Sequence, residues 1–562
     1  MAYAQLAGLP IEIGLYTAFI PVIIAALFGS SPQMSTGPVT IVSLMTATAL
    51  APVASAGIEG YVAYASLIAF FTSLFYLLIG SLRLGVIVDF LSHPVIVGFT
   101  NAAALLTITS QASKIFGVSY EKGSNYFITL YNLTSSIISS THIVTFICGL
   151  SSIIFLVVVG KYFKKVPKIL ILLLLSISIS YITGYNSILG GSIVGDIPSN
   201  LPHLSLGFLE IGLSTLGFYD IFRLALFGVI IGLIGFTESI SVAKFVSYTT
   251  KKPLSPNKEL IGQGLANLSS SVFGGYGVAG SFSKTAVNLK AGATTGLTGV
   301  ITGLMVGFTL LYLTPFLAFL PIATLASIII VAVLHMIRFA PLNRAWKIEK
   351  HDAIIGYVTF FTTLLFTPNI EIGVLIGVLL SLILFIYRTM RPKVIELGLY
   401  KDGTYRDIDL FGLKTSENLG VYRFDGSLYF ANAGFFESTI LNYIAEKKKI
   451  SYIILDFEWV NNIDSSAEEM LGNLVERLKE NDIKVYITGI RTKVFEKLTI
   501  SKFIKNFSDK RLMLNIDEAL RRIKRKTDKK IDLSPLLEYE KDKKKDPELE
   551  KKVIKQIEKI SD

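Results

Sequence analysis

Long apolar runs fill the first 390 residues of this chain, and they constrain its fold more than any other feature. Each run approaches the length of about 20 apolar residues with which a helix crosses a bilayer. These runs cover residues 11–28, 61–79, 86–110, 142–160, 167–183, 219–243, 296–316, 321–337, 352–367 and 370–388. Since the whole chain of 562 residues is 51% hydrophobic, we predict an all-α, multi-pass membrane domain over residues 1–391.

Shorter apolar pieces interrupt this series at residues 37–50, 259–273 and 280–291. Their length suits broken or half-length helices that end inside the bilayer. The chain itself opens on MAYAQLAGLP, which is apolar but too short to span a membrane and lacks the layout of a signal peptide. We therefore expect the numbering to begin inside the first membrane helix, so that this helix is truncated.

Basic residues are concentrated in alternate loops between the predicted spans. Lysines and arginines cluster at residues 161–168, 244–258 and 338–350, whereas residues 184–218 carry neither. Because cytoplasmic loops of membrane proteins are enriched in Lys and Arg, we assign the basic loops to the cytoplasm. Two spans follow the last basic loop, which puts the soluble C-terminal part on the same side of a bacterial inner membrane or a plasma membrane.

Lys284 is the most informative single residue of the membrane part. It and Lys290 are the only formally charged residues between Leu260 and Ile337. A charge at membrane depth costs about 2.5 to 3.5 kcal/mol on insertion scales, so such a residue usually serves a ligand, an ion path or a partner. Lys284 lies in the motif GSFSKTAVN after a glycine-rich run. A short helix starting there can present backbone N–H groups and a cation to an anion.

A second turn has similar chemistry. In FGSSPQMSTGPVTIVSLM, Ser35, Thr36 and Gly37 precede Pro38 at the start of a short apolar piece, and Ser, Thr and Pro favour a helix N-terminus. Transporters with inverted repeats bind substrate where broken helices from the two halves meet near the midplane, with N-termini aimed at anionic groups. We therefore predict an anion site between the two turns. The alternative is that the small residues only allow close helix packing.

These motifs resemble the sulfate permease (SulP) family of anion transporters. The resemblance runs through MAYAQLAGLP, GLYTAFIP, FGSSPQMSTGP, HPVIVGFTNAAAL, GFTESISVAK, GSFSKTAVN and SIIIVAVLHMI, in the order of the family. It implies a core domain and a gate domain built from two inverted repeats of seven helices, with the anion between the third and tenth helices. It further implies a homodimer in a lipid bilayer and a C-terminal domain of the STAS type.

The resemblance also assigns roles to particular residues. The implied anion-binding residues are Ser35, Thr36, Gly37, Ser281, Phe282, Ser283 and Lys284, with Tyr3 and Gln5 from the first helix and with Phe99 and Thr100 lining the pocket. Lys284 departs from the family pattern, which usually has arginine there, and GFTNAAA places the bulkier Asn101 and Ala102 close to the pocket. Lysine lacks the bidentate fork of arginine, which leaves the identity of the oxyanion open.

Glu238 is the second candidate for chemistry, because it is an acid in the long apolar run IGLIGFTESISVAKFV. In proton-coupled relatives the matching glutamate is the proposed coupling residue, and sodium-coupled bicarbonate relatives bind the ion with carboxylate and hydroxyl groups on the same helix. Both interpretations make Glu238 the residue that binds a coupling H⁺ or Na⁺. The alternative is a structural contact with Lys244 or with helix backbone.

Other function classes lack support in the sequence. No carboxylate pair, Ser/His/Asp order or phosphate-binding loop has credible spacing in the membrane part, so we expect no enzyme activity. The single cysteine, Cys148, and five scattered histidines provide no metal motif, and we expect no cofactor. Membrane loops and the C-terminal tail account for the net charge of +11, so we expect no binding of nucleic acid.

Alternating strands and helices predict a small α/β domain over residues 420–527, after a linker at residues 392–419. GVYRFDG, SLYFANA, SYIILDF and KVYITGI are typical of strands, and GFFESTILNYIAEKK and SAEEMLGNLVERLKEN of helices. NNIDSSAEEM resembles the STAS signature, in which Ser465 and Ser466 match a phosphorylatable serine of bacterial anti-sigma-factor antagonists. Ser465 and Glu468 equally fit a capping box that starts a helix. Residues 528–562 form a charged tail, either a solvated helix or disordered.

Three functions remain open on the sequence alone. The first is a proton-coupled sulfate importer that works by alternating access. The second keeps the fold but carries bicarbonate with sodium, takes up dicarboxylates, or exchanges chloride for bicarbonate. The third is a membrane-tethered signalling protein whose STAS domain binds a cytosolic partner.

Overall fold

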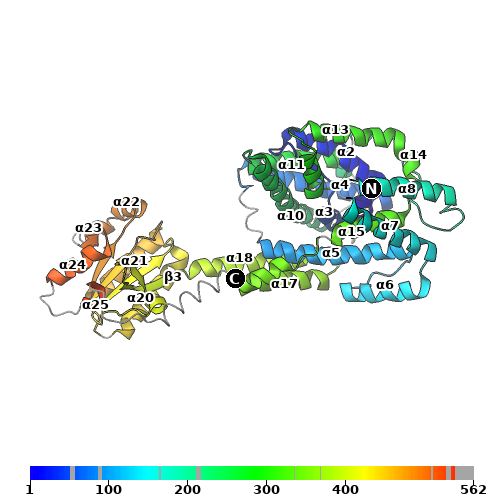
Figure 1. Ribbon diagram of the computed structural model, residues 1–562. Coiled ribbons are helices and arrows are strands. Elements are labelled where there is room, and N and C mark those ends of the chain that lie inside the picture. The colour runs from blue at the N-terminus through cyan, green and yellow to red at the C-terminus, as the bar shows by residue number, and fades with distance from the viewer. Residues whose placement is uncertain are drawn as a thin grey trace. The chain divides into compact units, whose positions relative to one another are not determined.

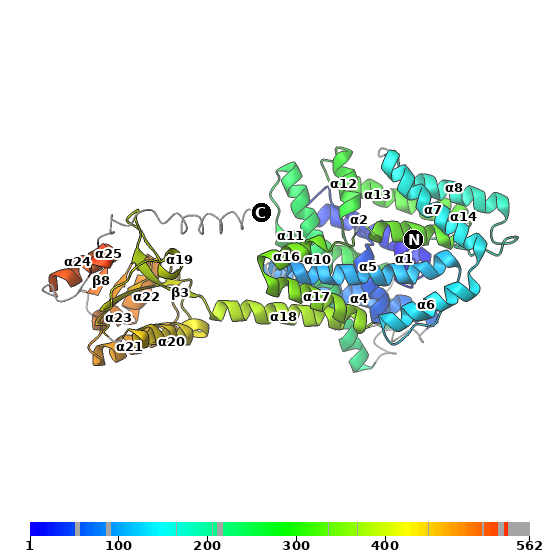
Figure 2. The same cartoon turned by 60° about the horizontal axis from the view of Figure 1, so that its bottom comes forward.

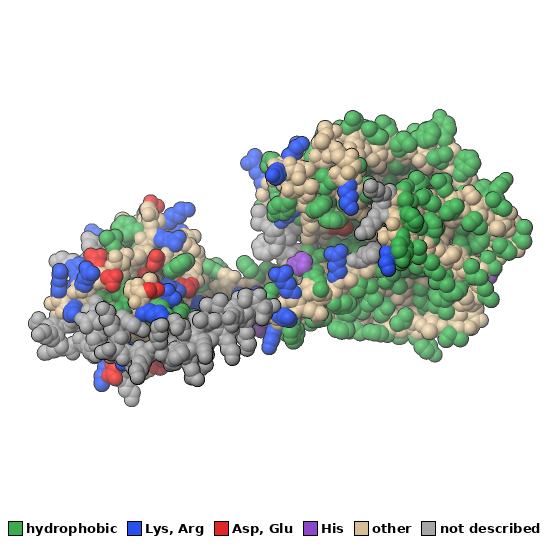
Figure 3. Space-filling view, in the orientation of Figure 1, with side chains coloured by type: hydrophobic (Ala, Val, Ile, Leu, Met, Phe, Trp, Pro, Cys, Tyr) green, Lys and Arg blue, Asp and Glu red, His purple; other side chains and the backbone are tan. Residues whose placement is uncertain are grey.

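The computed structural model describes residues 1–50, 57–85, 92–163, 166–204, 206–210, 217–334, 336–367, 369–447, 449–507, 511–526 and 533–537. The chain forms two compact units, Met1–Leu382 and Ile383–Asp562. Hydrophobic side chains spread over the visible face of the first unit, and its Lys and Arg side chains gather toward one end (Figure 3). This surface suits a multi-pass membrane domain with basic loops on one side.

Every apolar run predicted to span the membrane contains a helix, which confirms the predicted multi-pass helical domain. The helices are α2 (Ile11–Phe28), α4 (Gly57–Ser81), α5 (His93–Phe116), α7 (Ile143–Tyr162), α8 (Lys168–Thr183), α10 (Phe218–Thr250), α13 (Leu297–Phe308) with η3 (Thr309–Leu313) and α14 (Thr314–Leu317), α15 (Ile322–Leu334), α17 (Lys350–Leu365) and α18 (Ile370–Met390). Within the described ranges, seven helices are long and apolar enough to cross a membrane. Residues 86–91 and 335 of two predicted spans lie outside the described residues.

Shorter helices lie between the long ones. They are α1 (Ala2–Leu6), α3 (Thr40–Leu50), α6 (Tyr126–Ser140), α11 (Pro256–Val272), α12 (Phe282–Lys290) and α16 (Ala340–Ile348). Helices α3, α11 and α12 match the predicted short pieces, and α1 covers the apolar start of the chain. We did not predict α6, in which Asn, Thr and Ser interrupt the apolar run, or α16, which has only nine residues.

Glycines allow the membrane helices to pack closely. A Cβ at Gly98 of α5 would lie 2.1 Å from the carbonyl oxygen of Gly356 in α17, and the two helices run side by side in Figures 1 and 2. A Cβ at Gly262 of α11 would lie 2.6 Å from Gly29 Cα, just beyond the end of α2. Small residues permit such close contacts between helices in membranes. The contact at Gly262 brings α11 against the chain that leads into the predicted anion site.

The second unit is a six-stranded sheet with helices on both faces. Its strand order is β4 (Tyr405–Asp407), β3 (Lys393–Leu399), β5 (Leu419–Asp425), β6 (Tyr452–Asp456), β7 (Lys484–Thr488) and β8 (Leu512–Met513). The pairs β4–β3 and β3–β5 are antiparallel, and the remaining pairs are parallel. This arrangement confirms the predicted small α/β domain.

Each face of this sheet has its own apolar core. On one face, Phe424, Ile453 and Val485 pack with helices α20 (Phe430–Glu446), α21 (Ser465–Glu480), α22 (Thr492–Ile500) and α23 (Phe503–Phe507). On the other face, Val421 and Ile454 pack with α24 (Ile516–Lys526) and α25 (Ser534–Leu537). Alternate residues of one strand thus enter different cores, as the pleat of a strand requires.

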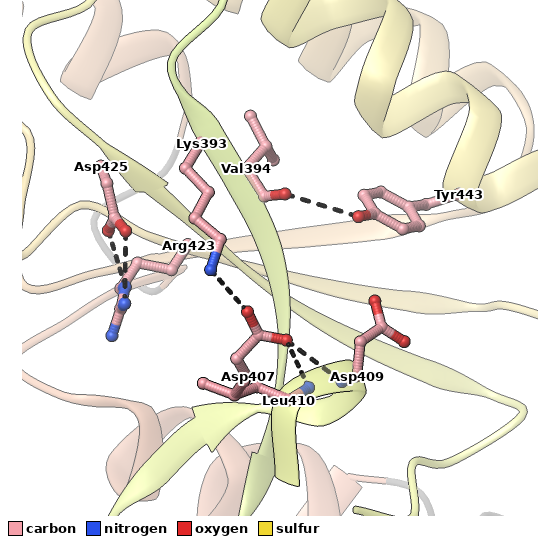
Figure 4. Close-up of polar contacts among 8 residues, drawn as sticks. All are labelled: Lys393, Val394, Asp407, Asp409, Leu410, Arg423, Asp425 and Tyr443. Atoms are coloured by element: carbon pink, nitrogen blue, oxygen red, sulfur yellow. Dashed lines mark hydrogen bonds and ion pairs between the residues drawn. The ribbon is translucent and has the colours of Figure 1, made fainter. Parts of the chain in front are cut away.

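The stretch expected as a linker at residues 392–419 instead belongs to the sheet. It contains β3, β4 and the short helix α19 (Ile408–Phe411), and β3 pairs with β5 along Lys393–Glu396. Figure 4 shows how this edge is fixed: Lys393 Nζ donates to Asp407 Oδ2 at 2.8 Å, and Tyr443 donates from α20 to the carbonyl oxygen of Val394 at 3.5 Å. Only two residues therefore separate the end of the last membrane helix, Met390, from the start of the sheet, Lys393.

Three further predictions for this unit need correction. SLYFANA is not a strand: Leu428 forms only an isolated bridge with Ile463, and the capping box of Tyr429 starts α20. The N-cap of α21 is Asp464, whose side chain accepts from the N–H of Ala467, so Ser465 is not the cap. In the predicted charged tail, residues 533–537 pack on the sheet with Leu536 only 1% exposed; the rest of the tail lies outside the described residues.

Candidate functional site

Two short strands join the two predicted anion-binding turns. Strand β1 (Ser35–Gly37) precedes α3, and β2 (Ala279–Ser281) precedes α12. The strands pair antiparallel, with Ser35 opposite Ser281 and Gly37 opposite Ala279. Segments about 240 residues apart in the sequence thus meet, as the inverted-repeat interpretation expects. The starts of the two broken helices are brought together by backbone pairing.

Strand β2 is fixed against the long helix α10. The N–H of Gly280 donates to Ser239 Oγ at 2.7 Å, and Ser239 is fully buried. A Cβ at residue 280 would lie 2.7 Å from Met34 Sδ and 3.1 Å from Ser239 Cα. A larger residue would therefore have to displace the Met34 side chain and press on the α10 backbone, so glycine favours this close approach. The register of β2, and hence the start of α12, is set by this contact.

Lys284 lies in the first turn of α12 and reaches across to β1. Its Nζ is 3.4 Å from the position that a Cβ would take at Gly37. The side chain is solvent-accessible, whereas the adjacent Thr285 is fully buried and its Oγ1 accepts from the N–H of Ser35 at 3.0 Å. The N-cap residue, Ser281, makes no capping hydrogen bond with its side chain. A cation and an uncapped helix N-terminus therefore face the same strand, which is an arrangement that binds anions.

The other predicted anion-binding residues surround this turn. Ser35 and Ser281 are buried, and Ser281 Oγ lies 3.4 Å from Ser283 Oγ. The ring of Phe282 is 52% exposed and packs on Phe245 of α10 with the ring centroids 4.8 Å apart.

Helix α1 contacts α3, the short helix that follows β1. The side chain of Tyr3 is hydrogen-bonded with that of Thr40, the first residue of α3. Gln5 Oε1 is buried and has no hydrogen-bond partner. A buried amide oxygen without a partner is costly, so this atom is an acceptor to which a bound group or a water molecule can donate.

Glu238 lies on α10, immediately before Ser239. Its Oε2 is buried and has no hydrogen-bond partner. The carboxyl interacts electrostatically with the phenols of Tyr3 and Tyr76. Among the described residues it forms no ion pair with Lys244, which was the expected structural alternative, and none with Lys284. Its place beside the β2 contact puts an unpartnered acid next to the segment that carries Lys284.

The residues expected to line the pocket, Phe99 and Thr100, lie on α5. Phe99 is buried and Thr100 half-buried on α5. Asn101, expected close to the pocket, binds the chain that follows α15: its Nδ2 donates to the carbonyl oxygen of Arg338 at 3.0 Å, and its Oδ1 accepts from the N–H of Arg338 at 2.7 Å. The Asn101 side chain therefore fixes the backbone between α15 and α16 with two hydrogen bonds.

Comparison with known proteins decides the family. Residues 1–359 match the family model described as Sulfate permease family, and residues 411–519 match the STAS domain. The chain belongs to the sulfate permease family. It is 34% identical over 513 residues to Sulfate transporter 4.1, chloroplastic, of Arabidopsis thaliana, covering 87% of this chain and 72% of the relative. It is 29% identical over 542 residues to High affinity sulfate transporter 2 of Stylosanthes hamata, covering 92% and 80%.

Solved structures agree with this family assignment. The fold of murine Solute Carrier 26 family member A9, an anion transporter in the inward-facing state, superposes with a TM-score of 0.83 at 20% identity, covering 93% of this chain and 88% of that one. The transmembrane domain of the cyanobacterial bicarbonate transporter BicA gives a TM-score of 0.56 at 25% identity, covering 68% and 92%. The first likeness covers nearly the whole of this chain, and the second is to a membrane domain alone.

In this member of the sulfate permease family, α11 carries polar residues that we did not predict as part of the site. Glu259 Oε2 accepts from the backbone N–H groups of Ser30 and Ser31 at 2.9 and 3.1 Å. Asn267 Oδ1 accepts from the N–H of Val278 at 2.9 Å, and its Nδ2 donates to the carbonyl oxygen of the same residue at 3.0 Å. The helix thus holds the segments that lead into both strands. The available signal was the spacing of polar residues in ELIGQGLAN.

The predicted regulatory serines of the STAS domain lie at the start of α21. Ser465 and Ser466 are both exposed. Asp464 beside them uses both carboxylate oxygens: Oδ1 accepts from Ala467 N at 2.9 Å and Oδ2 from Phe430 N at 2.8 Å. This carboxylate ties the starts of α21 and α20 together, so the turn around the serines has a structural role of its own.

Proposed function

We propose that this protein is a secondary active transporter that imports an inorganic oxyanion, sulfate, together with a proton by alternating access. Membership of the sulfate permease family supports anion transport, and the relatives named as sulfate transporters favour sulfate. The observation that carries the proposal is the position of Lys284. It is a cation at the N-terminus of a broken membrane helix, opposite β1 of the other half of the domain.

The roles of the site follow from its charges. The Lys284 ammonium attracts the anion as a point charge, and the first-turn N–H groups of α12 donate to its oxygens. Glu238 binds the coupling proton, because a protonated carboxyl is the less costly form inside a membrane domain. With sulfate at Lys284 and the proton at Glu238, the loaded site carries less negative charge past the apolar barrier than it would with the sulfate dianion alone. Coupling is then a consequence of electrostatics.

Alternating access requires the site to move relative to its surroundings. Strand β1 is hydrogen-bonded to α12 and strand β2 to α10, and Val278 just before β2 is hydrogen-bonded to α11. In this proposal these elements form a core that moves as one body. Helices α15 and α17 each pack against α5, and these three helices form the opposing gate in this proposal. In transporters of inverted-repeat architecture, one such body rocks against the other around a fixed site.

Uptake of radiolabelled sulfate into proteoliposomes tests the proposal. We expect saturable uptake that an inward proton gradient drives and a sodium gradient does not. Lys284→Ala abolishes it, whereas Lys290→Ala, the matched control at the far end of the same helix, does not. Glu238→Gln removes the dependence on the proton gradient. Saturable uptake by Lys284→Ala, or full proton dependence in Glu238→Gln, would overturn these assignments.

A sodium-coupled bicarbonate carrier is the second candidate. The likeness of the membrane domain to the cyanobacterial bicarbonate transporter supports it. Competition of sulfate uptake by selenate, bicarbonate, chloride and dicarboxylates in the same vesicles separates the two. Sodium-driven uptake that bicarbonate blocks and selenate does not would favour bicarbonate. Absence of flux for every anion would favour a signalling role for the STAS domain.

A further inference from the structure

Strand β1 is held on both of its faces. Successive side chains of a strand point to opposite faces, so Thr36 points away from the face shared by Ser35 and Gly37. On that shared face, Lys284 Nζ lies 3.4 Å from the Cβ position of Gly37. On the opposite face, Thr36 Oγ1 accepts a hydrogen bond of 2.8 Å from Gln263 Nε2 of α11. The anion-binding cation therefore meets one side of the strand, and a buried amide meets the other.

Gln263 is itself held by a carboxylate. Its Nε2 also donates to Glu259 Oε1 at 3.1 Å, so both hydrogens of the amide are used. The second oxygen of Glu259 binds the chain just before β1, through Ser30 and Ser31. Hydrogen bonds to a charged acceptor are stronger than those between neutral groups. The amide is therefore fixed in the orientation that reaches Thr36.

Burial makes these contacts costly to break. Glu259 and Gln263 are each 1% exposed and lie four residues apart, on one face of α11. A buried polar group that loses its partner has no water to replace it. Displacement of β1 from α11 is thus opposed by the same bonds that place β1 opposite Lys284.

We propose that Glu259 and Gln263 are positioning residues for the anion site. They set the place of β1 relative to Lys284 and thereby the affinity for the anion, without touching it. This inference rests on the proposed function, because it deepens the same site. Loss of the bond between Gln263 and Thr36 lets β1 shift relative to the cation, which weakens anion binding more than it slows turnover.

Sulfate binding and uptake by the full-length protein test the assignment. Gln263→Met keeps the length of the side chain but removes the donor, and Thr36→Val removes the acceptor. Each is expected to raise both the KM for uptake and the Kd for radiolabelled sulfate by up to about tenfold, with the maximal rate changed by less than about twofold. The double variant is expected to match the single variants, because all three lack the same bond.

Ser271→Ala is the matched control. Ser271 is also fully buried on α11, but its Oγ donates only within the helix, to the carbonyl oxygen of Leu268 at 2.8 Å. We expect it to leave KM and Kd unchanged. Thr36→Ser retains a hydroxyl and is expected to raise KM less than Thr36→Val does.

Each result either supports or overturns the assignment. The assignment is overturned if the increases in KM and Kd add up in the double variant. It is also overturned if Gln263→Met has the same KM and Kd as Ser271→Ala. Neither result contradicts anion transport. If Gln263→Met does not fold, a wild-type KM in Thr36→Val overturns it. A wild-type protein that neither binds nor carries any anion of the competition panel overturns the proposed function and this inference together.

Discussion

Replacing Lys447 with methionine is expected to weaken the STAS domain strongly at neutral pH and only slightly in acid. Lys447 Nζ forms an ion pair with Glu396 and also donates to Thr415 Oγ1 at 3.1 Å and to the carbonyl oxygen of Ser416 at 3.4 Å. The Glu396 side chain is only 4% exposed, and burial raises its pKa above the usual value although Lys447 lowers it. Methionine keeps the apolar stem of Lys447 but removes the cation.

The free energy needed to keep Glu396 protonated sets an upper limit on the stability that Lys447→Met loses. A buried carboxylate without its cation binds a proton rather than remain charged. The usual pKa of glutamate is about 4.3, so a fully protonated Glu396 in the folded variant costs at most about 3.7 kcal/mol of stability at pH 7 and about 1 kcal/mol at pH 5. The pKa of Glu396 is raised in the folded variant and ordinary in the unfolded chain. Stability from this group is therefore present in acid and lost as the pH rises, and the deficit of the variant grows from pH 5 to pH 7.

Trp459 provides the probe, because it lies after β6 with its ring 5.8 Å from the Arg423 guanidinium. The chain has two tryptophans, so Trp346→Phe leaves Trp459 alone. Urea unfolding of the full-length protein in detergent, followed by this fluorescence at both pH values, gives the free energy of unfolding of the domain.

Two further variants complete this test. Lys449→Met is the matched control: its ion pair with Glu417 is exposed on both sides, and we expect no measurable change. Adding Glu396→Gln to the Lys447→Met variant should remove most of the pH dependence. A deficit in Lys447→Met that is as large at pH 5 as at pH 7 would refute the reasoning.

Four other substitutions test contacts elsewhere. Gly37→Ala places a Cβ 3.4 Å from Lys284 Nζ, so the KM for anion uptake should rise by a factor of about three to ten. Asp464→Ala removes the N-cap of α21 and should lower the free energy of unfolding by about 0.5 to 2 kcal/mol. Ser465→Ala should change it by less than about 0.5 kcal/mol, and urea unfolding measures both variants. Leu536→Ala should cost about 2 to 3 kcal/mol in the same assay, and an unchanged midpoint would contradict packing of residues 533–537 on the sheet.

The membrane helices were predictable because the bilayer imposes a length and a polarity that are visible in sequence. Helix α2 begins and ends at the predicted residues, Ile11 and Phe28. Lys284 stood out for the same physical reason, since a charge in an apolar field is costly. The pairing of β1 with β2 was not predicted, because strands of three residues are too short to show any period.

The STAS domain shows where local propensity misleads. Aromatic residues make SLYFANA typical of a strand, but Asn432 within it accepts from the N–H of Tyr429 at 3.0 Å and starts a helix instead. Conversely, KVIELGL forms strand β3, in which Ile395, Glu396, Leu397 and Gly398 are all buried, although we predicted a linker there. A local capping box decides the first case, whereas pairing with β4 and β5 decides the second, and local sequence records such pairing weakly.

Glu259 shows how much of its environment can be predicted from the cost of burying a charged group. Read along the chain, it follows a basic loop and resembles an exposed acid in the first turn of a helix, where the macrodipole favours it. In the structure it is 1% exposed, and its partners Ser30 and Ser31 lie 229 and 228 residues earlier. No local pattern contains those partners, since only the packing of α11 against α2 supplies them. The regular spacing of Glu259, Gln263 and Asn267 was nevertheless visible, and polar groups at helical period in an apolar region indicate a face that must find donors and acceptors inside the protein.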